Sequence, residues 1–130
     1  MEYPSHAAVI RLHEHIIKQS DGQQGFASVS NLDYLLDTAR DVGGASQEEK
    51  AVVQKGGYLL FNLVSLHPFL DGNKRTAYEI TKAFLNLNGW EFNPSEDDAY
   101  STLKSIASGE LDVRATERWV GRNLRRGRKE

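Results

Sequence analysis

Apolar residues recur at helical spacing along nearly the whole of this chain, and alternation with a period of two residues is nearly absent. Ala77, Ile80 and Phe84 show the pattern, because steps of three and four residues place side chains on one face of a helix. We therefore expect an all-α fold, a compact bundle of about six helices. The spacing predicts these helices at about residues 5–18, 30–41, 47–66, 73–88, 95–108 and 113–125.

The segment from Ala51 to Leu66 is apolar on most sides, whereas the other predicted helices carry a single apolar stripe. A helix that is apolar all round is usually surrounded by its neighbours. We expect this segment to be the central helix of the bundle.

Short polar patterns mark several of the predicted helix ends. Ser46 with Glu49, and Ser95 with Asp98, fit the capping pattern in which a hydroxyl accepts a hydrogen bond from the first turn. Gly89 directly follows the fourth predicted helix, where a glycine commonly ends a helix. These patterns predict two helix starts and one helix end.

The composition is that of an ordinary globular protein, with 39% hydrophobic and 26% charged residues among 130. This length suits a single domain, which we expect to span residues 1–130. The chain has no cysteine, which excludes disulfides, cysteine-based zinc sites and thiol nucleophiles and fits a reducing cytoplasm. Its longest uncharged run, Gly56 to Leu70, is shorter than the ~20 apolar residues of a spanning helix, and no signal-peptide layout is present. We expect a cytoplasmic protein without a membrane partner.

The net charge of −2 hides an asymmetry between two parts of the chain. Residues 114–130 hold seven Lys and Arg against two Asp and Glu, which gives them a charge of +5, and residues 1–113 carry −7. A basic end of this kind could contact nucleic acid. Such runs are more often solvated helix ends that complement the negative end of the helix dipole. We favour that interpretation, so no direct nucleic-acid contact is expected.

Polar functional groups concentrate in one short segment, His67 to Thr76, between the central helix and the next one. Pro68 breaks the first helix, and Gly72 permits a tight loop. A loop that enters a helix N-terminus presents free backbone N–H groups and the positive end of the helix dipole, which suits a phosphate. The segment therefore predicts an anion site in a loop that joins two helices.

The side chains of this segment match the needs of a nucleotide. Lys74 and Arg75 fall in the first helical turn, where cations are unfavourable unless an anion such as a polyphosphate lies nearby. Asp71 offers a hard oxygen ligand for Mg²⁺ carried by those phosphates. His67 has an imidazole, which can accept a proton near neutral pH. Gly72 leaves room for close approach of the backbone.

Each of these residues also has an ordinary structural explanation, because a histidine before a proline can end a helix and Asp-Gly-Asn is common turn chemistry. Their combination in one loop is what favours a site. Phe69 and Leu70 are interpreted as apolar anchors that hold the loop to the core. The remaining histidines are assigned to a helix surface or a satisfied core edge, because no second ligand is spaced to form a site with them: His6, His13 and His15.

The stretch from His67 to Arg75, HPFLDGNKR, resembles the signature of the Fic/Doc family. That signature is His-Pro-Phe-x-Asp-Gly-Asn-Gly-Arg in Fic proteins and His-x-Phe-x-Asp-Ala-Asn-Lys-Arg in the Doc (death-on-curing) toxins. The likeness to Doc extends to the chain length, the Leu12-His13-Glu14 start and the Ser108-Gly109-Glu110 turn, so it covers nearly the whole chain.

This resemblance implies an all-α fold in which the active-site loop joins two core helices. His67 would be the general base that acts on a target hydroxyl, and Asp71 would hold Mg²⁺. The resemblance also implies a set of residues that bind the ATP phosphates: Asp71, Gly72, Asn73, Lys74 and Arg75.

Lys74 distinguishes between two reactions of the resembled family. In Fic proteins a glycine at this position leaves room for the α- and β-phosphates, so the hydroxyl attacks the α-phosphorus and the target is adenylylated. In Doc-like members the lysine is associated with a reversed nucleotide, and the γ-phosphoryl group is transferred. The resemblance therefore implies a protein Ser/Thr kinase. Tyr78 stands where the Fic pattern has its second arginine, which argues against adenylylation, whereas Gly72 keeps a protein adenylyltransferase open as the alternative. A non-enzymatic module that binds a peptide or nucleic acid is the third possibility.

A Doc-like enzyme would be the toxin of a toxin–antitoxin module. No Ser or Thr of the chain has a Glu four residues later, so the inhibitory Ser/Thr-x-x-x-Glu motif of many Fic proteins is absent. Restraint would then come from a cognate antitoxin whose helical C-terminal segment lies in a groove of the toxin. The target would be a cytoplasmic translation factor of the elongation factor Tu class, and growth arrest would follow. Residues 21–29 would form the edge where the target docks, with Phe26 and Val29 as apolar contacts.

Overall fold

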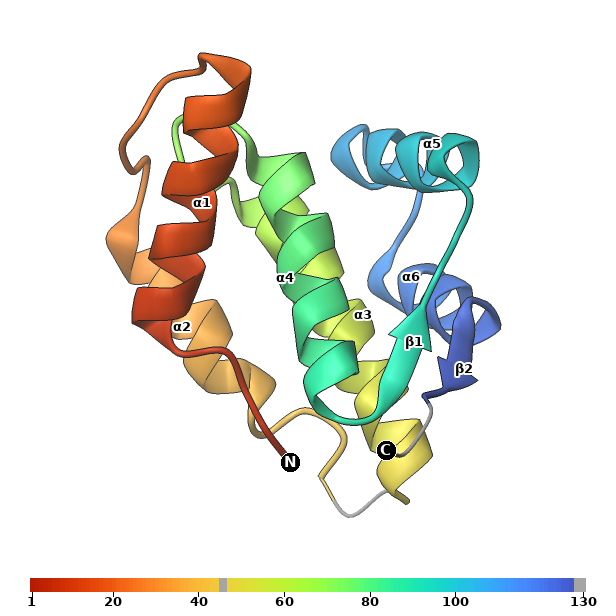
Figure 1. Ribbon diagram of the computed structural model, residues 1–130. Coiled ribbons are helices and arrows are strands. Elements are labelled where there is room, and N and C mark those ends of the chain that lie inside the picture. Colours follow the sequence, from red (N-terminus) through yellow and green to blue (C-terminus); the bar gives the residue numbers. More distant parts are fainter. Residues whose placement is uncertain (45–46, 128–130) are drawn as a thin grey trace.

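The computed structural model describes residues 1–44 and 47–127. Six helices and two short strands follow one another in these residues (Figure 1): α1 (His6–Ser20), α2 (Val29–Ala39), α3 (Glu48–Leu66), α4 (Asn73–Leu87), β1 (Trp90–Phe92), α5 (Glu96–Ala107), α6 (Val113–Arg122) and β2 (Leu124–Arg126). The expected all-α helical bundle is confirmed, and each helix lies within a few residues of its predicted range.

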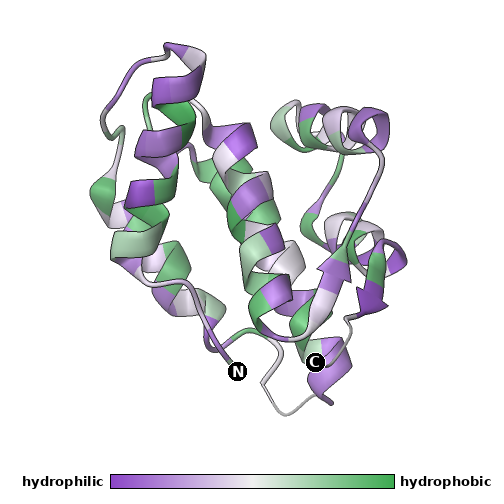
Figure 2. Cartoon of the chain, in the orientation of Figure 1, coloured by the Kyte–Doolittle hydropathy of each residue, from purple (hydrophilic) through white to green (hydrophobic). Residues whose placement is uncertain are grey.

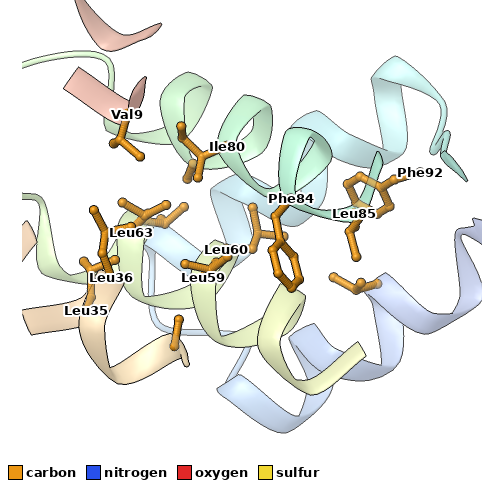
Figure 3. Close-up of a cluster of buried hydrophobic side chains, with 14 of the residues drawn as sticks. Val9, Leu35, Leu36, Leu59, Leu60, Leu63, Ile80, Phe84, Leu85 and Phe92 are labelled. Carbon is orange, nitrogen blue, oxygen red and sulfur yellow. The ribbon is translucent and has the colours of Figure 1, made fainter. Parts of the chain in front are cut away.

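The central position of α3 agrees with its apolar sequence. This helix packs against α2, α4, α5 and α6. Figure 3 shows Leu59, Leu60 and Leu63 of α3 among apolar side chains from α1, α2 and α4, and all three are buried. Because α3 and α4 both enter this core, the loop between them has firm anchors at its two ends.

The helices around α3 are amphipathic. In Figure 2, α1, α4 and α5 each carry both hydrophilic and hydrophobic residues. On α4, Ala77, Ile80 and Phe84 are all buried, as the predicted stripe requires. In the part of the chain that the structure describes, no helix is long and apolar enough to cross a membrane.

The predicted helix ends are found where the structure describes them. The Ser95 hydroxyl accepts a hydrogen bond from the Asp98 N–H at 3.1 Å and caps α5. Gly89 has a φ of +87° just after α4, in the left-handed region that favours glycine. Ser46, the start of the other predicted cap, lies outside the described residues.

A two-stranded antiparallel sheet is the element that the sequence pattern did not predict. β1 pairs with β2, and Glu91 lies opposite Arg125 with Oε2 and Nη2 2.7 Å apart. Strands of three residues are too short to show an alternating pattern. The last helix accordingly ends at Arg122, earlier than the predicted end at residue 125.

The basic end of the chain is exposed at Arg125 and Arg126, as we expected, but these two residues do not continue the helix. Arg125 and Arg126 lie in β2, where Arg125 pairs with Glu91 and the Arg126 guanidinium lies 4.6 Å from the centre of the Trp90 ring. The prediction of a helix is wrong for these two arginines because pairing with β1 ends the helical geometry. Residues 128–130, which contain the remaining basic residues of the run, lie outside the described part of the chain.

Candidate active site

The segment between α3 and α4 is a short loop with a strained start and a glycine at its end. His67 caps α3 with a φ of +47°, and Pro68 cannot extend the helix because it lacks an N–H. Gly72 has a φ of +74° and leads directly into Asn73, the first residue of α4. The prediction of a loop that joins two core helices is confirmed.

The side chain of His67 is exposed, and one of its ring nitrogens has a hydrogen-bond partner. Its Nδ1 lies 3.2 Å from the carbonyl oxygen of Ser65. Because a carbonyl oxygen can only accept, this contact favours the neutral tautomer with its hydrogen on Nδ1, which leaves the lone pair on Nε2. The geometry therefore suits Nε2 to accept a proton.

Phe69 anchors the loop, and Asn73 braces it. The Phe69 side chain is buried, and the Asn73 amide holds both of its backbone groups: Oδ1 accepts from the Phe69 N–H at 3.0 Å, and Nδ2 donates to the Phe69 oxygen at 2.8 Å. Leu70, the second expected anchor, is 49% exposed, so that interpretation is wrong. Successive side chains of an extended segment point to opposite sides, so a buried Phe69 directs Leu70 outward.

The carboxylate of Asp71 is oriented by two backbone N–H groups. Oδ2 accepts from Gln23 at 3.1 Å, and Oδ1 accepts from Gly72 at 2.8 Å. The residue is nevertheless exposed. A carboxylate oxygen can accept more than one hydrogen bond or ligand, so both oxygens retain capacity to bind a metal ion.

Two glycines allow α1 and the segment after it to approach the loop closely. A Cβ on Gly72 would lie 2.7 Å from Ile17 Cδ1, and a Cβ on Gly22 would lie 2.5 Å from Asp71 Oδ2. Real Cβ atoms do not make contacts this short. Gly72 thus has a packing reason in addition to its positive φ.

The N-terminus of α4 has free backbone N–H groups, and its first turn carries the two cations that we predicted to bind phosphate. The first helical hydrogen bond runs from the Thr76 N–H to the Gly72 oxygen at 2.9 Å, and Gly72 offers no side chain to cap the helix. The preceding N–H groups are therefore available to an anion. Lys74 and Arg75 are both exposed. Arg75 Nε lies 3.7 Å from Glu79, a loose exposed pair, and Lys74 forms no ion pair within the described residues.

A cleft of about 510 Å³ lies against this loop. It is lined by His67, Leu70, Asp71, Gly72, Asn73, Lys74 and Arg75 from the loop and the first turn of α4, and by Tyr100 and Leu103 from α5. Every residue predicted for a catalytic or nucleotide-binding role thus lines one cleft, while the roles themselves stay predictions. The α5 residues were missed as site residues, because nothing in an ordinary amphipathic helix signals that its side chains meet a loop so distant in sequence.

Tyr78 lies apart from the cleft. Its ring centre is 5.7 Å from that of Phe92, and the side chain is half-buried. Burial raises the pKa of the Tyr78 phenol, with Glu79 and Glu96 adding to the effect. The residue at the position of the second Fic arginine therefore packs toward β1.

Residues 21–28 are joined to the loop by backbone hydrogen bonds. Phe26 and Phe69 form an isolated antiparallel bridge, and the N–H groups of Ala27 and Ser28 both donate to the Pro68 oxygen. Phe26 is 37% exposed. The glycine-rich segment that we predicted to receive a target thus forms one rim of the loop, and Val29, which is also exposed, begins α2.

The other histidines fall where expected, with one contact that the sequence does not reveal. His6 is on the surface, where its ring nitrogens lie 2.9 Å from Asp33 and 3.1 Å from Asp37. His15 is exposed. His13 is a satisfied core-edge residue, but its partner is the carbonyl oxygen of Asp71 in the candidate site.

One known protein family matches the part of the chain that contains the loop. The model of the Fic/DOC family matches residues 3–85, which include α1 to α3, the whole loop and most of α4. Members of this family are generally transferases that use nucleoside triphosphates, often with Mg²⁺. No curated protein compared with the chain matches it. Because the family model covers well over half of the 130 residues, the chain belongs to the Fic/DOC family.

Proposed function

We propose that the chain is a Doc-like protein kinase that transfers the γ-phosphoryl group of ATP to a Ser or Thr hydroxyl of a target protein. The observation that supports this most is the sharing of one cleft by Lys74 and by His67, whose Nε2 keeps its lone pair. Phosphoryl transfer requires mainly positioning and charge neutralisation, and a base, a cation and a helix N-terminus supply these.

In the proposed reaction His67 accepts the proton of the target hydroxyl through Nε2. The hydroxyl oxygen then bonds to the γ-phosphorus, and the bond from that phosphorus to the β–γ bridging oxygen breaks, so ADP leaves. The first backbone N–H groups of α4, with Lys74 and Arg75, hold the phosphate oxygens while charge moves toward the leaving group.

Asp71 fits the role of holding Mg²⁺, because its exposed carboxylate is oriented by N–H groups and retains free lone pairs. The described residues contain no group of three His, Cys, Asp or Glu side chains placed to bind a metal. Magnesium typically takes one or two protein carboxylates and fills its other positions with phosphate oxygens and water. When bound, the ion would neutralise part of the charge on the phosphates.

A protein adenylyltransferase is the second candidate, and Gly72, which matches the Fic pattern, favours it. The structure gives Gly72 a separate explanation, since its φ of +74° favours glycine and a Cβ there would crowd the terminal methyl group of Ile17. Lys74 distinguishes the two reactions more directly, because a lysine lines the cleft at the position where Fic proteins have a glycine.

The proposed target is a translation factor of the elongation factor Tu class, docked at the rim formed by residues 21–29. The exposed side chains of Phe26 and Val29 support this placement, because apolar groups beside a catalytic loop can hold an extended peptide. We also propose restraint by a cognate antitoxin with a helical C-terminal segment. An apolar groove of about 440 Å³ between α1 and α4, lined by Ala8, Leu12 and Ala83 among others, has suitable chemistry for such a helix.

The experiment that tests the proposed function compares two labels. Purified elongation factor Tu, or a cell extract that contains it, is incubated with the protein and ATP labelled at either the γ- or the α-phosphorus. Transfer from the γ position alone supports the kinase, and the modified residue is then located by mass spectrometry. Transfer from the α position would replace the kinase with the adenylyltransferase, and no transfer from either would favour a binding module.

Two variants control this experiment. His67→Ala should abolish transfer while leaving the melting temperature nearly unchanged, because the side chain is exposed and packs against little. Lys74→Gly should allow transfer from the α position, since it removes the lysine side chain from a residue that lines the cleft. A Lys74→Gly protein with unaltered label preference would show that Lys74 does not select the reaction.

A further inference from the structure

His13 of α1 contacts the loop between α3 and α4. In Figure 1, α1 lies on one side of α4 and α5 lies on the other. The His13 side chain is only 3% exposed, and its Nε2 lies 2.8 Å from the carbonyl oxygen of Asp71. The ring also stacks on Phe69, with centres 3.7 Å apart and planes at 8°. Because the carbonyl can only accept, Nε2 carries a hydrogen and donates it.

The carbonyl that His13 binds belongs to the peptide between Asp71 and Gly72. The N–H of the same peptide donates to Asp71 Oδ1 at 2.8 Å. A peptide is planar, so a donor that fixes its oxygen also fixes its N–H. Gly72, with its φ of +74°, is the residue type that lets a neighbouring peptide rotate at low steric cost. His13 therefore restrains a peptide that would otherwise rotate easily.

Rotation of this peptide would have two effects on the cleft. The Asp71 carboxylate would lose the Gly72 N–H, which is one of the two groups that orient it. The Asp71 carbonyl oxygen would also leave His13 and turn to the side that the Gly72 N–H now occupies, which puts its partial negative charge beside Asp71 Oδ1. Both effects disfavour the present orientation of the carboxylate that would hold Mg²⁺.

We infer that His13 is a positioning residue that locks the Asp71–Gly72 peptide, and with it the Asp71 carboxylate and the entrance of α4, in the arrangement that binds Mg-ATP. The inference rests on the proposed function for its consequence, nucleotide binding. The lock itself is a property of the protein alone and can be measured without nucleotide.

Two variants of similar shape isolate the hydrogen bond. His13→Gln keeps an N–H donor at nearly the reach of Nε2, whereas His13→Met has about the same length and no donor. Both lose the ring that stacks on Phe69, so that loss is common to the two proteins. Any difference between the two variants therefore reports the effect of the N–H donor at position 13.

The first measurement is amide hydrogen exchange at Gly72 in the protein without nucleotide. We expect exchange to be about tenfold or more faster in His13→Met than in His13→Gln, because only the latter holds the peptide. The second is calorimetric titration with Mg-ATP, in which His13→Met should bind about tenfold more weakly than His13→Gln, and the Gln variant should approach the unaltered protein.

Equal exchange at Gly72 in the two variants would show that the His13 hydrogen bond does not hold the peptide. Faster exchange in His13→Met with equal Mg-ATP affinity in the two variants would overturn the positioning role. If the unaltered protein binds no Mg-ATP, the proposed function fails, while the exchange comparison still decides whether His13 locks the peptide. A measurement on the unaltered protein covers the case in which both variants unfold: nitrogen NMR of the imidazoles should find the hydrogen on Nε2 in His13 and on Nδ1 in His67. An Nδ1–H tautomer at His13 would overturn the inference.

Discussion

Asp71 is the residue that links the loop to the metal chemistry that we propose. The N–H groups of Gln23 and Gly72 orient its carboxylate. Asp71→Asn keeps an acceptor oxygen but loses the charge, so we expect Mg-ATP affinity to fall about tenfold or more. Calorimetry measures this, and titration with ATP in the presence of a magnesium chelator is the control, in which the two proteins should bind alike. Unchanged affinity for Mg-ATP would remove Asp71 from the metal site.

Glu117, which does not line the cleft, makes the free energy of unfolding depend on pH. Burial raises the pKa of its carboxyl above the ordinary 4.5, against the opposing effect of Arg114 and Arg118. A raised pKa in the folded state means that stability is fully present below the unfolded pKa and is lost as pH rises through the folded pKa. Glu117→Gln removes this loss, so it should melt at a higher temperature than the unaltered protein at about pH 7 and at the same temperature at about pH 4.

Thermal melting across this pH range checks the prediction for Glu117. A variant that is less stable at neutral pH, or a difference in melting temperature that stays constant with pH, would contradict it.

At the scale of residues, the sequence predicted the part of the site that is contiguous. His67, Asp71 and Lys74 fall within one short stretch, the loop and the first turn of α4, so their types and spacing alone bring them together. His13 and Tyr100 come from helices distant in sequence, and their positions depend on how α1 and α5 pack. The partner of His13 in particular could not be predicted, because it is a backbone carbonyl, and every residue has one.

Lys55 of α3 stabilises the end of a neighbouring helix. Its side chain is buried, and Nζ donates to the carbonyl oxygens of Ala39 at 3.1 Å and of Arg40 at 2.7 Å, at the end of α2. These carbonyls form the negative end of the α2 dipole and stabilise the buried ammonium. Lys55→Met should lower the free energy of unfolding by about 1–3 kcal/mol, because it leaves both carbonyls without this donor.

Urea denaturation measures this change, and Lys50→Met is the matched control on the same helix. Lys50 is exposed, so its replacement should change the free energy of unfolding by less than about 0.5 kcal/mol. Equal effects of the two substitutions would show that Lys55 does not cap α2.

The contact between α3 and α6 depends on the absence of a side chain at Gly57. A Cβ there would lie 2.6 Å from Glu117 Cγ and 2.8 Å from the Cα of the same residue, and the backbone of α6 cannot move away cheaply. Gly57→Ala should therefore destabilise the protein by about 1–3 kcal/mol. Gly121→Ala, across the same interface, would place its Cβ an ordinary 3.5 Å from Val53 and should be neutral or stabilise by up to about 1 kcal/mol. Denaturation curves that show the opposite order would contradict this view of the interface.

At the scale of elements, the helices were predictable and the sheet was not. Helices such as α3 and α4 are long enough for several turns of the apolar pattern, and local signals such as Ser95 and Gly89 mark their ends. β1 and β2 have three residues each, and their pairing joins segments more than thirty residues apart. The end of α6 was misplaced for the same reason, since the chain leaves the helix in order to pair with β1.

At the scale of the whole molecule, the cleft depends on the loop between α3 and α4 and on the parts of the chain that surround this loop. Residues 21–28 and α1 hold one side of the loop through Gln23 and His13, the core holds its two ends, and α5 supplies the opposite wall of the cleft. The family match ends at residue 85, so the α5 wall lies beyond the matched part. In this arrangement α1 and the core hold the loop in place, and α5 forms the facing wall of the candidate cleft.

The central claim is that this cleft binds the triphosphate of Mg-ATP at the entrance of α4 with the γ-phosphorus toward His67. A crystal structure of the protein with Mg²⁺ and a non-hydrolysable ATP analogue tests it most directly. We predict phosphate density against the first turn of α4, with the γ-phosphorus as the phosphorus nearest to His67 Nε2. A cleft that stays empty at saturating nucleotide, or one in which the α-phosphorus lies nearest to that nitrogen, would contradict the account.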